Sequence, residues 1–231
     1  MVKNLSVTIK KPFFRKGDIE FPESKSLTVF LGLTGSGKTT LLLECVAQWL
    51  KKDIPVAFVT SIGAYELVEK EVPNLSFCTD VKFLKSLKDK YSDLFNIYSY
   101  ENLSSFDVSE KVLVLDEFHL GVNTSLITEL ANSAPHIFVS TQIYSEISVW
   151  INDLNVTNHE NLHFIIMESD IADLRSLPKV NHQQNDLENL VQVADWEAKR
   201  KSFRSFISLT QLQDQSRVHV HKFLLKGHSA F

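Results

Sequence analysis

The sequence of 231 residues predicts a three-layer α/β domain with a mainly parallel central sheet. Short, nearly continuous apolar runs alternate along it with stretches of helical periodicity. Such runs are typical of strands buried on both faces, because helices cover both sides of a parallel sheet. The two ends of the sequence instead alternate apolar and polar residues, which predicts antiparallel edge strands contributed by both termini.

The elements follow one another in a regular order. Buried strands are expected at 26–31, 55–61, 75–78, 111–117, 136–142 and 162–167, and helices at 38–51, 64–72, 80–91, 125–131, 170–177 and 186–201. Residues 96–110 are interpreted as a loop that contains a further strand, and residues 205–225 as a hairpin. We interpret the chain as a single domain with an N-terminal extension (1–25), a core (26–180) and a C-terminal helix and hairpin (181–231).

Composition excludes several classes of protein. A net charge of −4 argues against a protein that coats nucleic acid over a broad surface. No apolar run reaches the length of a membrane span, and no targeting segment is recognised. Cys45 and Cys78 form no C-x-x-C pair and lie in apolar segments, so we expect reduced core cysteines of a cytoplasmic protein.

The stretch "GLTGSGKTT" fits the Walker A pattern G-x-x-x-x-G-K-[ST] and lies between a predicted strand and a predicted helix. Such a loop wraps its backbone N–H groups around phosphates at a helix N-terminus. Lys38 is expected to reach the β- and γ-phosphates of ATP, and the Thr39 hydroxyl to bind Mg²⁺. The expected nucleotide-binding residues are Gly32, Thr34, Gly35, Ser36, Gly37, Lys38, Thr39 and Thr40.

A Walker B pair, Asp116 and Glu117, follows the apolar run "VLVL". Carboxylates at this end of a parallel strand lie where ligands gather in open α/β sheets. We expect Asp116 to hold Mg²⁺ and Glu117 to polarise the attacking water, which favours an NTPase over a nucleotide kinase. The quartet "DEFH" is similar to the D-E-x-H box of superfamily 2 helicases, but the chain is too short for the two RecA-like lobes of those enzymes. We therefore interpret His119 as a loop or interface residue.

The run "HIFVSTQ" ends in polar residues, and Gln142 is the candidate sensor of the γ-phosphate and the attacking water, or else a cap of the strand end. Lys38 and Asp116 are 116 − 38 = 78 residues apart, which leaves room for strands between the two motifs. This spacing favours the class of P-loop ATPases (RecA/ASCE-like) that carries an additional strand between the Walker strands.

The motifs "GLTGSGKTT", "VLVLDEF" and "FVSTQIY", with the segment "SDIADLRSLP", resemble the FtsK/HerA group of ATPases over residues 26–180. Within that group they are most similar to viral genome-packaging ATPases of poxvirus type and of membrane-containing icosahedral viruses. The resemblance implies a ring-shaped homo-oligomer that moves double-stranded DNA into a procapsid, with a capsid or procapsid vertex protein as partner. It implies a location in the host cytoplasm or in association with the virion. It also implies an arginine finger supplied in trans, for which Arg175 is the candidate. The rivals are Arg15 and, on the expected C-terminal helix, Arg200 and Arg204.

Other functions stay open. The chain lacks the membrane segment and winged helix of the large FtsK translocases, and the membrane span of the Zot proteins, which share the strand ending in "TQ". A nucleotide-dependent assembly or switch ATPase acting on a protein partner is the main alternative, and a nucleotide kinase is a further one. Four lysines on one expected helix are either DNA contacts or a solvated face: Lys82, Lys85, Lys88 and Lys90. His219 and His221 are either a metal-binding pair or an exposed strand face.

Overall fold

The computed structural model of the chain describes residues 4–10, 16–22, 24–70, 79–119, 121, 123–154, 162–167, 204–212 and 215–223. Its strands are β1 (Val7–Lys10), β2 (Lys16–Ile19), β3 (Ser26–Leu31), β4 (Val56–Thr60), β5 (Phe95–Ser99), β6 (Val112–Leu115), β7 (His136–Thr141), β8 (Leu162–Ile166), β9 (Arg204–Leu212) and β10 (Gln215–Phe223). Its helices are α1 (Lys38–Leu50), α2 (Ile62–Glu69), α3 (Thr79–Lys90), α4 (Thr124–Ser133) and α5 (Tyr144–Asp153).

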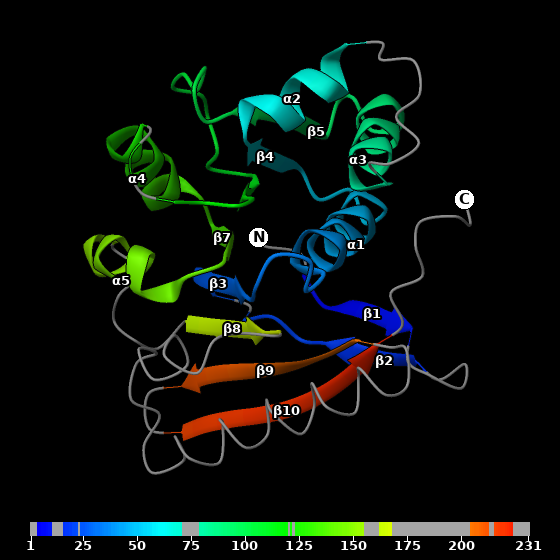
Figure 1. Cartoon of the computed structure of the whole chain (residues 1–231), viewed down its shortest axis with the longest axis vertical. Coiled ribbons are helices and arrows are strands. Elements are labelled where there is room, and N and C mark those ends of the chain that lie inside the picture. The colour runs from blue at the N-terminus through cyan, green and yellow to red at the C-terminus, as the bar shows by residue number, and fades with distance from the viewer. Residues whose placement is uncertain are drawn as a thin grey trace.

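The central sheet has the strand order β10-β9-β8-β3-β7-β6-β4-β5 (Figure 1). The strands from β8 to β5 run parallel, and β9 and β10 add an antiparallel edge. The mainly parallel sheet and the C-terminal edge hairpin are therefore confirmed. Because β7 lies between β3 and β6, the expected additional strand between the two motif strands is confirmed as well. This is the three-layer P-loop NTPase fold.

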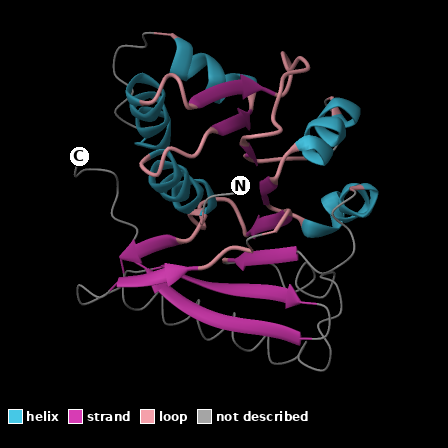
Figure 2. Cartoon of the chain, turned by 180° about the vertical axis from the view of Figure 1, so that it is seen from behind, coloured by secondary structure: helices cyan, strands magenta, loops and turns pink. Residues whose placement is uncertain are grey.

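The helices cover the sheet from two sides, with α4 and α5 on one face and α1 and α3 on the other (Figures 1 and 2). Side chains of β3 alternate between the two faces: Val29 packs in the core with α4 and α5, whereas Phe30 packs in the core with α1 and α3. All six residues of β3 are buried, which explains its continuous apolar sequence.

The prediction that the N-terminus adds an edge strand to the central sheet is wrong. Strands β1 and β2 pair with each other in a separate two-stranded sheet, while β9 occupies the edge of β8. The hairpin is instead bound to α1: Gln48 accepts a hydrogen bond from the Thr8 backbone N–H (2.8 Å) and donates one to the Thr8 carbonyl (2.9 Å). The indole N–H of Trp49 donates to the carbonyl of Leu5 (2.7 Å). These side chains satisfy backbone groups that a second sheet edge would otherwise have to pair.

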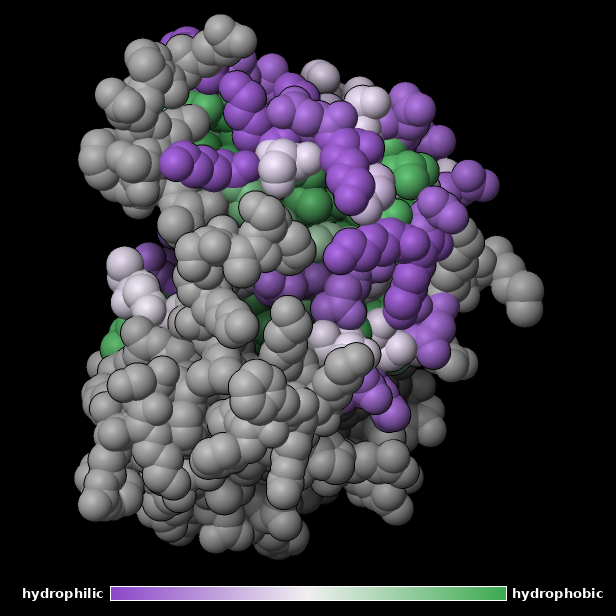
Figure 3. All heavy atoms as spheres, turned by 90° about the vertical axis from the view of Figure 1, so that its right-hand side faces the viewer, coloured by the Kyte–Doolittle hydropathy of each residue, from purple (hydrophilic) through white to green (hydrophobic). Residues whose placement is uncertain are grey.

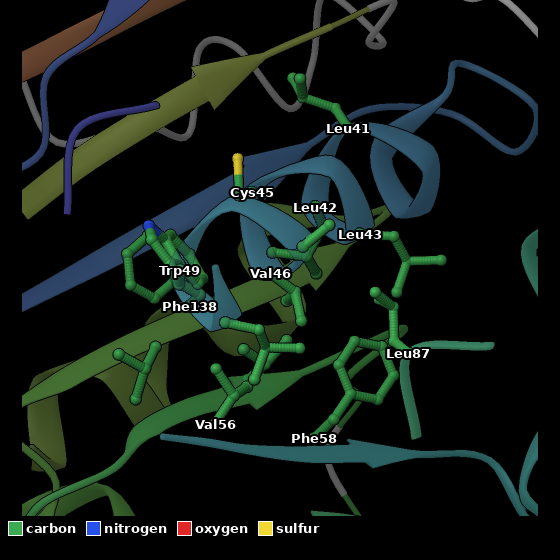
Figure 4. Close-up of a cluster of buried hydrophobic side chains, with 14 of the residues drawn as sticks. Leu41, Leu42, Leu43, Cys45, Val46, Trp49, Val56, Phe58, Leu87 and Phe138 are labelled. Atoms are coloured by element: carbon green, nitrogen blue, oxygen red, sulfur yellow. The ribbon is translucent and has the colours of Figure 1, made fainter. Parts of the chain in front are cut away.

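An aromatic cluster lies between α1 and the sheet, where Trp49 packs on Phe138 with ring centroids 4.5 Å apart (Figure 4). Phe21, which follows β2, packs against Phe138 with ring centroids 5.1 Å apart and so extends the cluster toward the N-terminal hairpin. Cys45 is buried in the same core, where burial raises the pKa of its thiol, so the expectation for this cysteine is confirmed. Cys78 lies outside the described residues.

Most of the expected elements match the observed ones within a few residues. The strand within 96–110 corresponds to β5, and the expected strand 75–78 and helices 170–177 and 186–201 lie outside the described residues. Arg204 begins β9, where it pairs with Phe223, so its expected position on a C-terminal helix is wrong. Helix α5 is not among the predicted elements, although Ile147, Trp150 and Ile151 have the spacing of a buried helix face.

Because His136 is buried, we expect the free energy of unfolding to fall when the pH is lowered. This residue is fully buried, its Nδ1 lies 3.0 Å from the Ser26 hydroxyl, and burial lowers its pKa to about 4. Below the ordinary histidine pKa the unfolded chain binds a proton that the folded chain does not, so stability is lost as the pH falls from 6.5 toward 4. This histidine contributes up to about 3 kcal/mol of that loss.

Urea unfolding of the wild type and of His136→Gln at pH 7 and pH 4.5 checks this expectation. The non-titrating variant should lose less stability between the two pH values, because His163 and the carboxylates are common to both proteins. Equal losses would show that His136 is not the group responsible.

Candidate active site

The loop between β3 and α1 has the backbone of a phosphate-binding loop. Gly35 and Gly37 have φ values of 78° and 97°, a left-handed conformation that favours glycine. Gly37 is the N-cap of α1, and no side chain caps this helix end. The first N–H groups of α1 are therefore available to an anion at the positive end of the helix dipole.

Lys38, the first residue of α1, bends back over this loop. Its Nζ donates hydrogen bonds to the carbonyls of Gly32 (2.6 Å) and Leu33 (3.0 Å). The side chain is buried, which lowers its pKa, while attraction to Asp116 and Glu117 acts in the opposite direction. The ammonium group of Lys38 is thus held against the backbone carbonyls of the loop.

The two motifs meet at Thr39 and Asp116. The Thr39 hydroxyl lies 3.1 Å from Oδ1 and 3.4 Å from Oδ2 of Asp116, although β7 separates the strands that precede them. Asp116 is buried, and burial raises its pKa to about 6; Glu117 adds to this, while hydrogen bonds from Ser140 and Thr39 and the charge of Lys38 oppose it. None of the described lysines forms a salt bridge with Asp116. A hydroxyl and a buried carboxylate at one point are the hard oxygen donors that suit Mg²⁺.

Glu117 lies in a different environment from its neighbour, because its side chain is exposed. Its φ of 52° is left-handed, which is uncommon for a residue with a side chain. The backbone N–H of Glu117 donates to the Ser140 hydroxyl (2.8 Å), and that of Phe118 donates to the Ser140 carbonyl (2.8 Å). His119 is exposed on the loop that follows, with Nδ1 3.2 Å from the Glu117 carbonyl, in agreement with its interpretation as a loop residue.

Gln142 directly follows β7 and its side chain is exposed. Its neighbour Thr141 is in register with Leu31, the last residue of β3, and the Thr141 carbonyl accepts a hydrogen bond from the N–H of Gly32 (3.3 Å). The candidate sensor therefore lies beside the start of the phosphate-binding loop.

Other predicted residues are not brought together here. The Thr40 hydroxyl donates a hydrogen bond to Oδ1 of Asp80 (3.2 Å), which connects α1 to α3. Arg15, Arg175 and Arg200 lie outside the described residues, and so do the side chains of Arg204, His219 and His221. Within the described part of the chain, no group of three or more histidine, cysteine, aspartate or glutamate residues could hold a metal ion.

Hydrophilic side chains cover much of the described surface on the side of α3 (Figure 3). The lysines of this helix have different surroundings: Lys82 is exposed, Lys88 forms a salt bridge with Glu69, and the Nζ of Lys90 lies 5.3 Å from the ring centroid of Tyr91. Of the four lysines considered as DNA contacts, Lys88 is therefore already paired with a carboxylate.

Two residues of the site are absent from the sequence predictions. Ser140 donates to Oδ1 of Asp116 (2.6 Å), and the hydroxyl of Tyr100 donates to the Asp116 carbonyl (2.9 Å). The only signal for Ser140 was a polar residue at the end of an apolar strand, and Tyr100 follows β5 without any motif.

No protein-family model matches the sequence, and no curated protein matches it either. Among solved structures, the genome-packaging NTPase B204 of Sulfolobus turreted icosahedral virus 2 is 15% identical with a TM-score of 0.45, over 87% of this chain and 99% of that one. The flagellar accessory protein FlaH of Methanocaldococcus jannaschii is 11% identical with a TM-score of 0.48, over 90% and 88%.

The pCW3 conjugation coupling protein TcpA is 16% identical with a TM-score of 0.46, over 98% of this chain and 68% of that one.

None of the described helices combines the length and the apolar character needed to cross a membrane. The strand order and the glycine-rich loop before α1 are those of the P-loop NTPase fold. Viral genome-packaging NTPases are among the solved structures to which the chain is similar.

Proposed function

We propose that this protein is a Mg²⁺-dependent ATPase. The observation that carries this proposal is the contact between the Thr39 hydroxyl and the Asp116 carboxylate, 3.1 Å apart, beside a helix N-terminus that no side chain caps. A hydroxyl, a carboxylate, a lysine and the backbone donors of a helix N-terminus together suit a nucleoside triphosphate with its cation.

The residues have separate roles in this proposal. The first turn of α1 and the loop before it bind the phosphates through backbone N–H groups other than those of Gly32 and Ser36, which donate to backbone carbonyls. Lys38 leaves the loop carbonyls to neutralise the β- and γ-phosphates. Thr39 and Asp116 would hold Mg²⁺, which supplies positive charge to the phosphate oxygens when it is bound.

The exposed carboxylate of Glu117 orients a water molecule and accepts its proton, so that the water oxygen forms a bond to the γ-phosphorus. The bond between this phosphorus and the bridging oxygen breaks, and ADP and inorganic phosphate are the products. Gln142 would contact both the γ-phosphate and the water.

We further propose that hydrolysis moves double-stranded DNA, in a ring-shaped homo-oligomer that docks on a procapsid vertex protein. Support comes from the resemblance of the three motifs to viral genome-packaging ATPases. Arg175 remains the proposed trans arginine finger. The net charge of −4 agrees with DNA contact through a few residues and not through a broad surface.

ATP turnover with Mg²⁺ tests the ATPase proposal. Lys38→Ala should weaken ATP binding by about 10- to 100-fold, because charge-assisted hydrogen bonds to the phosphates are lost. The matched control is Lys51→Ala, since Lys51 lies exposed at the other end of α1 and should leave turnover within about twofold of the wild type. Equal losses in both variants, or a wild type that releases no phosphate, would contradict the proposal.

Product analysis and duplex DNA separate the motor from its alternatives. The motor predicts faster phosphate release with duplex DNA and an oligomer in the presence of ATP. Turnover that ignores DNA would favour an assembly or switch ATPase, and phosphate transferred to a nucleoside or nucleotide would favour a kinase.

A further inference from the structure

We infer that Ser140 is a positioning residue that fixes both acidic residues of the site through a single hydroxyl group. It lies on β7, between the strand of the phosphate-binding loop and the strand of the acidic pair. Its kinetic consequence rests on the ATPase function proposed above, whereas its structural consequence does not.

The direction of each hydrogen bond at Ser140 is determined by the groups involved. The backbone N–H of Glu117 can only donate, so the Ser140 oxygen accepts at 2.8 Å. The single hydroxyl proton of Ser140 is then left for Oδ1 of Asp116, at 2.6 Å. One hydroxyl therefore orients the carboxylate of Asp116 and the backbone of Glu117 at the same time.

The Glu117 backbone needs such a restraint. A left-handed conformation, here with a φ of 52°, costs a residue with a side chain free energy that neighbouring contacts must offset. The next residue, Phe118, is fixed by the hydrogen bond to the Ser140 carbonyl and by packing on Trp150, with ring centroids 4.6 Å apart. The hydroxyl fixes the other side of Glu117, and the two restraints together set the direction in which its side chain leaves the backbone.

Solvent cannot easily replace this hydroxyl. Ser140 is fully buried and Asp116 is 5% exposed. An alanine at position 140 therefore leaves the Glu117 N–H without its acceptor, and Oδ1 of Asp116 keeps the Thr39 hydroxyl but loses the closer Ser140 donor. Gln142 follows the same strand, two residues after Ser140, so Ser140 also connects the acidic pair to the strand that precedes the candidate sensor. Strand β7 thus connects the acidic pair with the candidate sensor Gln142.

Amide hydrogen exchange of the nucleotide-free protein tests the structural part. In Ser140→Ala the Glu117 amide should exchange about 10-fold faster than in the wild type, because its hydrogen-bond acceptor is removed. The matched control is Ser26→Ala, which removes a fully buried, hydrogen-bonded hydroxyl at the start of the neighbouring strand β3, opposite His136 at the other end of β7. Exchange at Glu117 should not change in the control. Unchanged exchange in Ser140→Ala would overturn the inference.

Steady-state kinetics test the functional part. Ser140→Ala should lower kcat about 10- to 100-fold and leave KM for ATP within about twofold, because the phosphate-binding loop is unaltered. Ser26→Ala should change neither parameter, even if it destabilises the protein. Equal kcat in Ser140→Ala and the wild type would overturn the positioning role.

If Ser140→Ala does not fold, Ser140→Cys replaces it, since a thiol of similar size is a weaker donor and acceptor. The same directions are expected in both measurements, and wild-type exchange and kcat in the cysteine variant would overturn the inference. A wild type without ATP turnover contradicts the proposed function alone, because the exchange experiment still decides whether Ser140 holds Glu117.

Discussion

Glu117→Gln is expected to lower kcat for ATP hydrolysis by about 10²- to 10⁴-fold, with KM for ATP within about twofold of the wild type. The amide has almost the shape of the carboxylate but cannot accept the proton of the attacking water. Glu117 is exposed, while Asp116 beside it is buried and in contact with Thr39. The substitution therefore removes the proposed general base and leaves the proposed cation-binding groups in place.

Phosphate release under saturating ATP and Mg²⁺ measures the effect, and retention of labelled ATP on gel filtration shows that binding persists. Glu129→Gln is the matched control, because Glu129 is an exposed glutamate on α4. Wild-type turnover in Glu117→Gln would show that another group activates the water.

Phe138→Ala is expected to destabilise the protein by about 3–5 kcal/mol, the usual cost of removing a fully buried phenylalanine. Phe138 is the centre of the aromatic cluster: its ring centroid lies 4.5 Å from Trp49, 5.1 Å from Phe21 and 6.5 Å from Phe30. These partners come from α1, from the residues after β2 and from β3, so the resulting cavity cannot close by a local movement.

Urea unfolding followed by tryptophan fluorescence measures this loss. Val149→Ala is the control, because Val149 is 64% exposed on α5 and its truncation should change stability by no more than about 0.5 kcal/mol. A loss below about 1 kcal/mol in Phe138→Ala would contradict the central position of this ring in the core.

The parts of the fold that follow from local patterns could be predicted. The apolar run of β3, the glycine-rich loop and the helix after it carry their signals in consecutive residues, so their positions were predicted within a residue or two. The separation of the two motifs even indicated the additional strand that β7 supplies.

Features that depend on tertiary partners could not be predicted in this way. The N-terminal residues have a strand pattern, but whether they join the central sheet depends on Gln48 and Trp49, which bind the hairpin to α1 through contacts with Thr8 and Leu5, 40 and 44 residues away. Likewise, the sequence identifies Asp116 and Glu117 by their motif, but nothing in it shows that Ser140 contacts both. Such contacts arise only when β7 takes its place beside β6.

The left-handed backbone of Glu117 has a consequence for how this sequence evolves. Glycine or asparagine would adopt a φ of 52° with less strain, so selection for thermal stability alone would favour either residue at this position. The glutamate costs the native state about 1 kcal/mol of backbone strain. Position 117 is therefore a point where stability and activity are in conflict, and variants that gain melting temperature by changing it are expected to do so at the expense of turnover.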